Sequence, residues 1–136
     1  CIRDSFEYIA GAPPVILDGA HNADSAAELA RTYQAYFPHA RAVVLAAVMA
    51  DKDIESILDA FAGFARRAVT VQADGRRGAD AEALARGFAA RGVRAEPSFN
   101  VASAYARARA LAMRARAPLV ICGSFYLAGG VKALMR

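Results

Sequence analysis

Polar side chains that could bind a ligand follow three apolar segments of this sequence. Asp18, His21 and Asn22 come directly after an apolar run, at a turn of small residues that opens into a helical pattern. Lys52 lies between two aspartates after a second apolar run, and Ser124 follows a third. A strand that ends at such a turn and leads into a helix presents backbone N–H groups to a ligand. These residue types therefore suit a polar ligand such as a sugar hydroxyl or a phosphate.

Each of these side chains also has a purely structural interpretation. Asp18 could accept hydrogen bonds from ribose hydroxyls or from N–H groups of its own turn. His21 and Asn22 could face a phosphate, although capping the following helix is favoured for either residue taken alone. Lys52, one of only two lysines in the chain, could hold a carboxylate as a point charge or pair with a neighbouring aspartate. Ser124 could bind a ligand carboxylate or simply turn the chain.

The elements that must position these residues alternate between strand and helix patterns. Buried strands separated by helices of this length predict an α/β fold, a three-layer Rossmann-like domain with a mostly parallel, mixed sheet and helices on both faces. Because ligands bind beyond the carboxyl ends of parallel strands, we expect the three polar turns to line one edge of this sheet. The expected strands are 5–9 (an edge strand), 15–17, 42–49, 68–72, 93–96 and 119–122, and the expected helices are 22–37, 54–64, 80–90 and 101–115.

The connections carry fewer signals. Asp51 is the expected N-cap of the second helix. The segment 74–78 is predicted to be a flexible loop whose Arg76 and Arg77 are solvated. The chain after Ser124 contains two consecutive glycines and is predicted to be a short tail. The dinucleotide fingerprint GxGxxG is absent after the early strands, which disfavours an NAD or FAD site.

Length and composition indicate one packed domain. The 136 residues are 57% hydrophobic and 22% charged, which is typical of a globule with one core and not of a disordered segment. The 17 basic and 13 acidic residues give a net charge of +4, which suits an anionic small molecule as well as nucleic acid. The arginines are scattered and form no basic run, so no nucleic-acid partner is predicted.

The two cysteines and the hydropathy pattern indicate the compartment. Cys122 lies in an apolar run and is predicted to be a buried hydrophobe, so a disulfide is not expected. A reducing, cytoplasmic compartment follows from that pattern. No signal peptide and no apolar run long enough to span a bilayer are visible, so no membrane partner is predicted. The chain opens at Cys1 without an initiator Met, and we expect it to be one domain of a longer polypeptide.

Three motifs together resemble one enzyme family. They are Leu-Asp-Gly-Ala-His-Asn at 17–22, Asp-Lys-Asp at 51–53 and Gly-Ser-Phe-Tyr-Leu at 123–127. In this order and spacing the chain resembles, from about Ser5 to Leu134, the C-terminal domain of the folylpolyglutamate synthase/dihydrofolate synthase family within the Mur ligase superfamily. The resemblance implies that residues 1–136 are a single Mur-ligase-like C-terminal domain, a fragment of a longer enzyme.

The resemblance also implies an activity for that longer enzyme. In this family, ATP phosphorylates the carboxylate of a folate or dihydropteroate, and the amine of L-glutamate attacks the acyl phosphate. The site lies between this domain and an N-terminal P-loop domain that is expected to hold Mg²⁺. No GxxxxGK[ST] motif occurs in these residues, so we expect the isolated domain to be inactive. Separately, we expect the protein to be cytoplasmic and monomeric.

Particular residues of this chain match the family's motifs. Asp18 matches the aspartate that contacts ATP, and His21 and Asn22 match its neighbours on the nucleotide side. Lys52 and Ser124 match positions expected to hold the carboxylate of the incoming glutamate. The resemblance implies no catalytic residue and no metal ligand in this domain.

The chain departs from the family pattern at two places. Ala23 follows Asn22 where the family usually has proline, a loss that the first helical turn should tolerate. Ser5 stands where the family commonly has an arginine that contacts ATP, so either Arg3 replaces that arginine or nucleotide binding is altered. Two alternatives remain open: a non-catalytic nucleotide-binding module, which the missing arginine favours, and a domain of a Mur-type peptide ligase, which the motifs at 51–53 and 123–127 disfavour. Pterin recognition is expected to lie mainly in the other domain, so dihydrofolate synthase and folylpolyglutamate synthase activities both fit.

Overall fold

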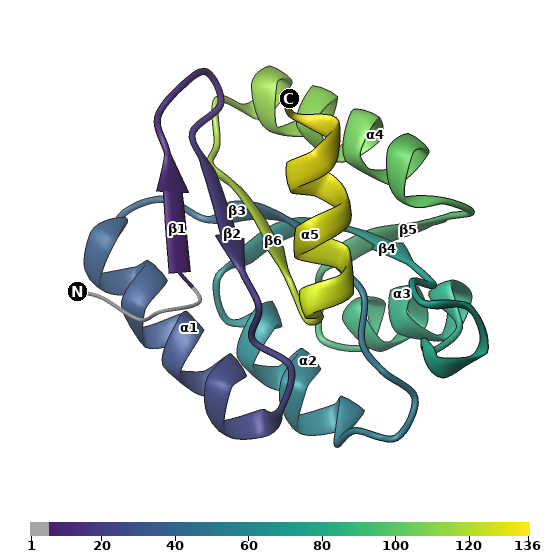
Figure 1. Cartoon of the computed structure of the whole chain (residues 1–136). Helices are drawn as coiled ribbons and strands as arrows, with labels where there is room; N and C mark the ends of the chain where they lie inside the picture. Colours follow the sequence, from purple (N-terminus) through teal and green to yellow (C-terminus); the bar gives the residue numbers. More distant parts are fainter. Residues whose placement is uncertain (1–5) are drawn as a thin grey trace.

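A six-stranded mixed sheet forms the centre of the molecule (Figure 1). The structure, a computed structural model, describes residues 6–136. Its first strand pairs antiparallel with the second, and the other neighbouring pairs are parallel. This arrangement confirms the predicted mostly parallel, mixed sheet. In spatial order the strands are β1 (Phe6–Ile9), β2 (Val15–Asp18), β6 (Leu119–Cys122), β3 (Ala42–Ala46), β4 (Ala65–Val71) and β5 (Arg94–Ser98).

Helices cover both faces of the sheet, which confirms the three-layer prediction (Figure 1). The strands are apolar on both sides, so alternate residues face opposite layers. Ile16 and Val44 belong to the hydrophobic cluster with α1, α2 and α3, whereas Leu17 and Leu45 belong to the cluster with α4 and α5. The helices are α1 (Ala23–Tyr36), α2 (Ile54–Ala62), α3 (Ala81–Ala89), α4 (Val101–Ala115) and α5 (Phe125–Leu134), and a short 3₁₀ turn, η1, spans Gly75–Arg77.

The predicted buried thiol is confirmed. Cys122 at the end of β6 is fully buried and forms no disulfide among the described residues. Burial, and to a smaller extent the carboxylate of Asp18, raises the pKa of the Cys122 thiol well above its usual range. Asp18 and Cys122 lie at the same end of the adjacent strands β2 and β6.

The final helix was not predicted. Gly129 and Gly130 are poor helix formers, and the sequence therefore indicated a tail. In the structure, Ser124 caps α5, and Leu127 and Val131, four residues apart, are fully buried against the sheet. Burial of this apolar stripe outweighs the low helix propensity of the glycine pair.

Several element bounds and one helix cap differ from the prediction, and β4 begins at Ala65, three residues earlier than expected. β3 ends at Ala46 and not at Met49, because its partner β6 stops at Cys122. β5 continues through Pro97, which a strand at the edge of a sheet tolerates because one side needs no N–H donor. The N-cap of α2 is Asp53 and not Asp51, since the carboxylate of Asp53 accepts the N–H of Ser56 three residues on.

Two further expectations concern the N-terminal residues and membrane-spanning helices. Arg3 and Ser5, the residues at the expected position of the family's arginine, lie outside the described residues. Among residues 6–136, none of the helices combines the length and the apolarity that crossing a bilayer requires.

Gly123, directly after β6, occupies a position where the backbone conformation and the close packing both favour glycine. Its φ is +106°, and a Cβ added there would lie 2.0 Å from the carbonyl oxygen of Ala47. We predict that Gly123→Ala lowers the free energy of unfolding by about 2–4 kcal/mol. Gly129→Ala is the matched control: its Cβ would meet nothing within 4 Å, so helix propensity should raise stability by roughly 0.5–1 kcal/mol. Urea denaturation of both variants measures the two effects, and changes of the same sign would contradict this account.

Candidate functional site

Three turns that are distant in sequence meet at one edge of the sheet. The parallel register pairs Leu17 of β2 with Ile121 of β6, and Ala46 of β3 with Cys122, so these strands end side by side. A cavity of about 460 Å³ lies beyond their carboxyl ends. His21, Lys52 and Ser124 all line it, which confirms that the three predicted turns converge. The rest of the lining is Met49, Ala50, Asp51, Asp74, Arg77, Phe125 and Tyr126.

The other two predicted residues do not line the cavity. Asp18 is fully buried at the end of β2, and its Oδ1 accepts the N–H of Ala20 at 2.7 Å. Asn22 is exposed and is the N-cap of α1, where its Oδ1 accepts the N–H of Ser25 at 2.8 Å. The Ser25 hydroxyl in return accepts the N–H of Asn22, which completes a capping box. Both residues therefore hold the turn that presents His21.

His21 has a fixed side-chain orientation. Its Nδ1 lies 3.0 Å from the carbonyl oxygen of Gly19. Since a carbonyl only accepts, this bond requires a proton on Nδ1, which leaves Nε2 of the neutral ring as an acceptor. The imidazole also contacts the ring of Phe125, with a centroid distance of 5.1 Å. These contacts explain how a half-buried side chain keeps one orientation at the cavity.

Phe125 joins the first turn to the third. Its ring lies so close to Gly19 that an added Cβ would be 2.2 Å from Cε1 of Phe125. The lack of a side chain at Gly19 thus creates the space for this ring. Phe125 is nevertheless 61% exposed, and its neighbour Tyr126 is 56% exposed. The cavity is therefore bordered by an aromatic pair that the described residues leave largely uncovered.

Lys52 is a half-buried cation without an ion-pair partner. Within residues 6–136, no carboxylate approaches its Nζ to within ion-pair distance, so the structural interpretation of pairing with Asp51 or Asp53 is not supported. Asp53 instead caps α2, and its hydrogen bonds with Ser56 lower the pKa of the Asp53 carboxyl. Lys52 is thus available to pair with another anion.

Ser124 is buried and has a structural role as well as a place in the cavity. Its Oγ accepts the N–H of Leu127 at 3.2 Å and so caps α5. In the part of the chain that the structure describes, the hydroxyl donates no hydrogen bond. Ser124 can therefore cap the helix and donate to a ligand at the same time.

The loop after β4 adds residues that the sequence analysis did not assign to the site. Asp74 and Arg77 line the cavity, with Arg77 Nε 3.6 Å from Asp74 Oδ2. The loop is anchored by an isolated antiparallel bridge between Met49 and Gly78, with Ala50 N–H donating to the carbonyl of Arg77 at 2.8 Å. This anchoring differs from the predicted flexible loop. The available signal was that β4 ends at the same edge as the other parallel strands.

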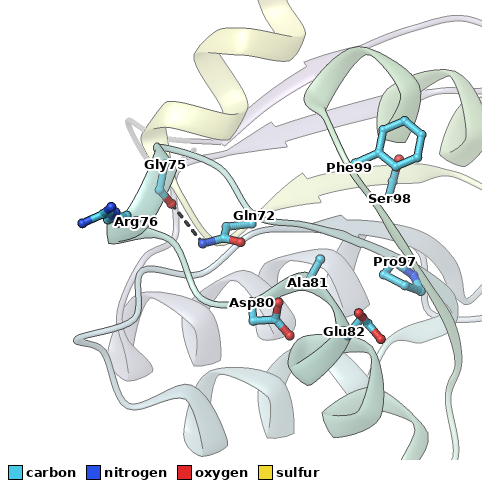
Figure 2. A pocket seen from close by; sticks show the side chains of 9 residues that line it. All are labelled: Gln72, Gly75, Arg76, Asp80, Ala81, Glu82, Pro97, Ser98 and Phe99. Atoms are coloured by element: carbon cyan, nitrogen blue, oxygen red, sulfur yellow. Dashed lines mark hydrogen bonds between the residues drawn. The ribbon is translucent and has the colours of Figure 1, made fainter.

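A second cavity lies on the other side of the same loop (Figure 2). It measures about 560 Å³ and lies between the ends of β4 and β5. Figure 2 shows Arg76 at its rim, pointing outward, while the amide nitrogen of Gln72 donates to the carbonyl of Gly75. None of the predicted site residues lines it. Among residues 6–136, no group of three or more His, Cys, Asp or Glu side chains is arranged to hold a metal ion.

Comparison with known proteins gives one family and several similar structures. The family described as "Mur ligase, glutamate ligase domain" matches residues 6–125. Comparison with curated proteins found no match.

The similar structures are of longer proteins. Folylpolyglutamate synthase of Mycobacterium tuberculosis, complexed with ADP and AMPPCP, is 32% identical with a TM-score of 0.86, over 94% of this chain and 31% of that one. E. coli FolC in complex with DHPP and ADP is 26% identical with a TM-score of 0.82, over 96% and 30%. A bifunctional folylpolyglutamate synthase/dihydrofolate synthase with Mn, AMPPNP and L-glutamate bound is 26% identical with a TM-score of 0.79, over 100% and 32%. The chain thus spans about a third of the length of these proteins.

The contact between Gly19 and Phe125 leads to a prediction about His21. Gly19→Ala should displace the exposed Phe125 ring and remove its ring-current effect from the His21 imidazole protons. Phe125→Leu should change the same NMR shifts in the same direction, whereas Phe99→Leu, at an exposed ring near the second cavity, should leave them unchanged. If Phe125→Leu moves the His21 signals and Gly19→Ala does not, the close packing at Gly19 is wrong.

Proposed function

The chain belongs to the Mur ligase glutamate ligase domain family, and on this premise we propose that residues 1–136 form the C-terminal domain of an ATP-dependent amide ligase. The proposed enzyme adds L-glutamate to a folate or dihydropteroate through an acyl phosphate. Similar structures bound to ADP, to ATP analogues and in one case to L-glutamate support these ligands. The observation that carries the proposal is the convergence of His21, Lys52 and Ser124 on one cavity.

The two ligands would occupy different parts of that cavity. Lys52 supplies the positive charge for the glutamate carboxylate, and the Ser124 hydroxyl supplies a hydrogen-bond donor. His21, with Nε2 as an acceptor, lies on the nucleotide side, together with the turn that Asp18 and Asn22 hold. This assignment keeps the predicted ATP residues at one turn and the predicted glutamate residues at the two neighbouring turns.

The contribution of this domain is orientation. Holding the amine of glutamate in line with the acyl phosphate can supply on the order of 7–11 kcal/mol in favourable cases. Exclusion of water protects the acyl phosphate from hydrolysis. We propose that the partner P-loop domain holds Mg²⁺, which neutralises charge on the transferred phosphoryl group when bound. We further propose that the enzyme is a cytoplasmic monomer.

The division of labour between the two domains is testable. We predict that the 136-residue chain alone releases no ADP above background with ATP, L-glutamate and a pteroate substrate, because it contains no phosphate-binding P-loop. The same chain joined to its P-loop domain should release ADP in a glutamate-dependent manner. Robust turnover by the chain alone would contradict the proposed division. If ADP release by the joined enzyme does not depend on glutamate or pteroate, another Mur-type ligase or a nucleotide-binding module is favoured.

Variants at the two proposed subsites should affect the KM values for L-glutamate and for ATP separately. In the full-length enzyme, Lys52→Ala should raise the KM for L-glutamate about ten- to a hundredfold while the KM for ATP stays within about twofold, because one charged hydrogen bond is lost. His21→Ala should show the opposite pattern. Lys132→Ala is the matched control, since Lys132 is the other lysine and pairs with Glu7 on the surface. Unchanged glutamate kinetics in Lys52→Ala would remove Lys52 from the site.

A further inference from the structure

The second cavity of the domain is separate from the candidate site. No residue of the described chain lines both cavities, and the loop at 74–78 runs between them, with Arg77 on one side and Arg76 on the other. The second cavity, of about 560 Å³, lies where β4 and β5 end and where α3 begins (Figure 2). Cavities of roughly 300–1,000 Å³ are typical of small-molecule sites. The proposed ligase reaction gives this cavity no role.

Hydrogen bonds hold two walls of this cavity in place. The amide nitrogen of Gln72 donates to the carbonyl oxygens of Gly75 and Gly78, at 3.1 and 3.0 Å. Because both N–H groups of the amide are then used, Oε1 of Gln72 is left as an acceptor. In addition, the buried hydroxyl of Thr70 donates to the carbonyl of Ala81 at 2.7 Å, which ties the first turn of α3 to β4. The fold therefore fixes the walls that these residues form.

Two carboxylates at the start of α3 line the cavity, those of Asp80 and Glu82. Asp80 is the N-cap of this helix, and its Oδ2 accepts the N–H of Ala83 at 3.0 Å. Within the described part of the chain, Oδ1 of Asp80 accepts no hydrogen bond, and the Glu82 side chain has neither a hydrogen bond nor an ion pair. One oxygen of Asp80 and both oxygens of Glu82 can therefore accept hydrogen bonds from a ligand.

An exposed aromatic ring completes the lining. Phe99, in the connection between β5 and α4, is 90% exposed and is the most exposed of the large hydrophobic side chains among residues 6–136. The backbone next to it is fixed, because Asn100 caps α4 by accepting the N–H of Ser103 at 2.7 Å. Figure 2 shows the Phe99 ring on one side of the cavity and Asp80 and Glu82 on the other. The face of such a ring attracts a cation.

The charges of the cavity favour a cation over an anion. The Asp80 carboxylate already occupies the positive end of the α3 dipole, and an anion placed there would also face Glu82. Arg76 is the one cation in the described lining, and Figure 2 shows its side chain pointing away from the cavity. A bound cation would instead meet two carboxylates, the acceptor of Gln72 and the ring of Phe99.

We propose that this cavity binds an organic cation, an alkylguanidinium or alkylammonium group, between the carboxylates of Asp80 and Glu82 and the ring of Phe99. Such a group has several N–H donors for the acceptors and an apolar chain that can contact Pro97. The cation belongs either to a free amine or guanidine or to an arginine or lysine side chain of the proposed P-loop domain. Its binding does not depend on the proposed function, because none of these residues lines the cavity that contains Lys52.

Calorimetric titration of the 136-residue chain, whose own helices cover both faces of its sheet, with butylguanidinium at low ionic strength tests the proposal. We expect binding to one site that weakens as salt is added, and at least about tenfold weaker binding of butylurea, which has a similar shape but no charge. Glu82→Gln should weaken butylguanidinium binding about two- to tenfold, and Phe99→Ala about two- to fivefold. Asp24→Asn, at an exposed acid in the first turn of α1, is the matched control and should leave the affinity unchanged.

The chain joined to its P-loop domain distinguishes the two sources of the cation. If the joined protein still binds butylguanidinium, the cavity takes a free cation; if only the separate chain binds it, a cationic side chain of the other domain occupies the cavity. The proposal is overturned if the separate chain does not bind butylguanidinium, if it binds butylurea equally well, or if Glu82→Gln and Phe99→Ala both bind like the wild type. The proposed function would stand in that case, because glutamate-dependent ADP release is assigned to the other cavity.

Discussion

The parallel register of β2, β6 and β3 is the constraint on which the site depends. Three turns separated by up to a hundred residues meet because their strands end side by side, about one strand spacing apart. The meeting is close enough that Gly123 packs against the carbonyl of Ala47 with no room for a side chain. A shift of one residue in any of these pairings would turn buried side chains toward the wrong layer. Hydrophobic burial on both faces of the sheet thus fixes the positions of the polar residues at its edge.

Each turn at this edge both begins a helix and supplies a residue to the cavity, and the two tasks are mostly divided between neighbours. Asn22 caps α1 and Asp53 caps α2, which leaves His21 and Lys52 next to them without a capping role. Ser124 combines the two tasks, because a hydroxyl can accept from the helix and still donate. This division explains why the most conspicuous polar motif contains residues that do not reach the cavity. Asp18 and Asn22 shape the turn, and His21 projects from it.

Local patterns predicted most of the fold, and long-range contacts account for what they missed. The apolar runs and turn residues identified the strands and the first four helices, and the rule for parallel sheets placed the three turns at one edge. Helix α5 was missed because burial of Leu127 and Val131 depends on the sheet beneath them. The lack of an ion pair at Lys52 could not be predicted, because Asp53 is its neighbour in sequence. In the structure, the carboxylate of Asp53 accepts the N–H of Ser56 instead. Arg77 is exposed, as predicted, but its place in the lining of the cavity could not be foreseen, because the bridge between Met49 and Gly78 joins segments almost thirty residues apart.

The surroundings of the cavity are consistent with the proposed role of a second domain. Among the described residues, Lys52 is half-buried and Arg77 is exposed, so water and salt weaken the attraction of these cations for an anion. The exposed rings of Phe125 and Tyr126 border the same cavity and form an apolar rim beside charged residues. A surface that covers these rings would also remove water from the cavity and lower the local dielectric constant. A second domain that covers the aromatic rim would therefore also strengthen the contacts between the cations and a bound anion. In the proposed ligase, domain closure and substrate binding would be linked in this way.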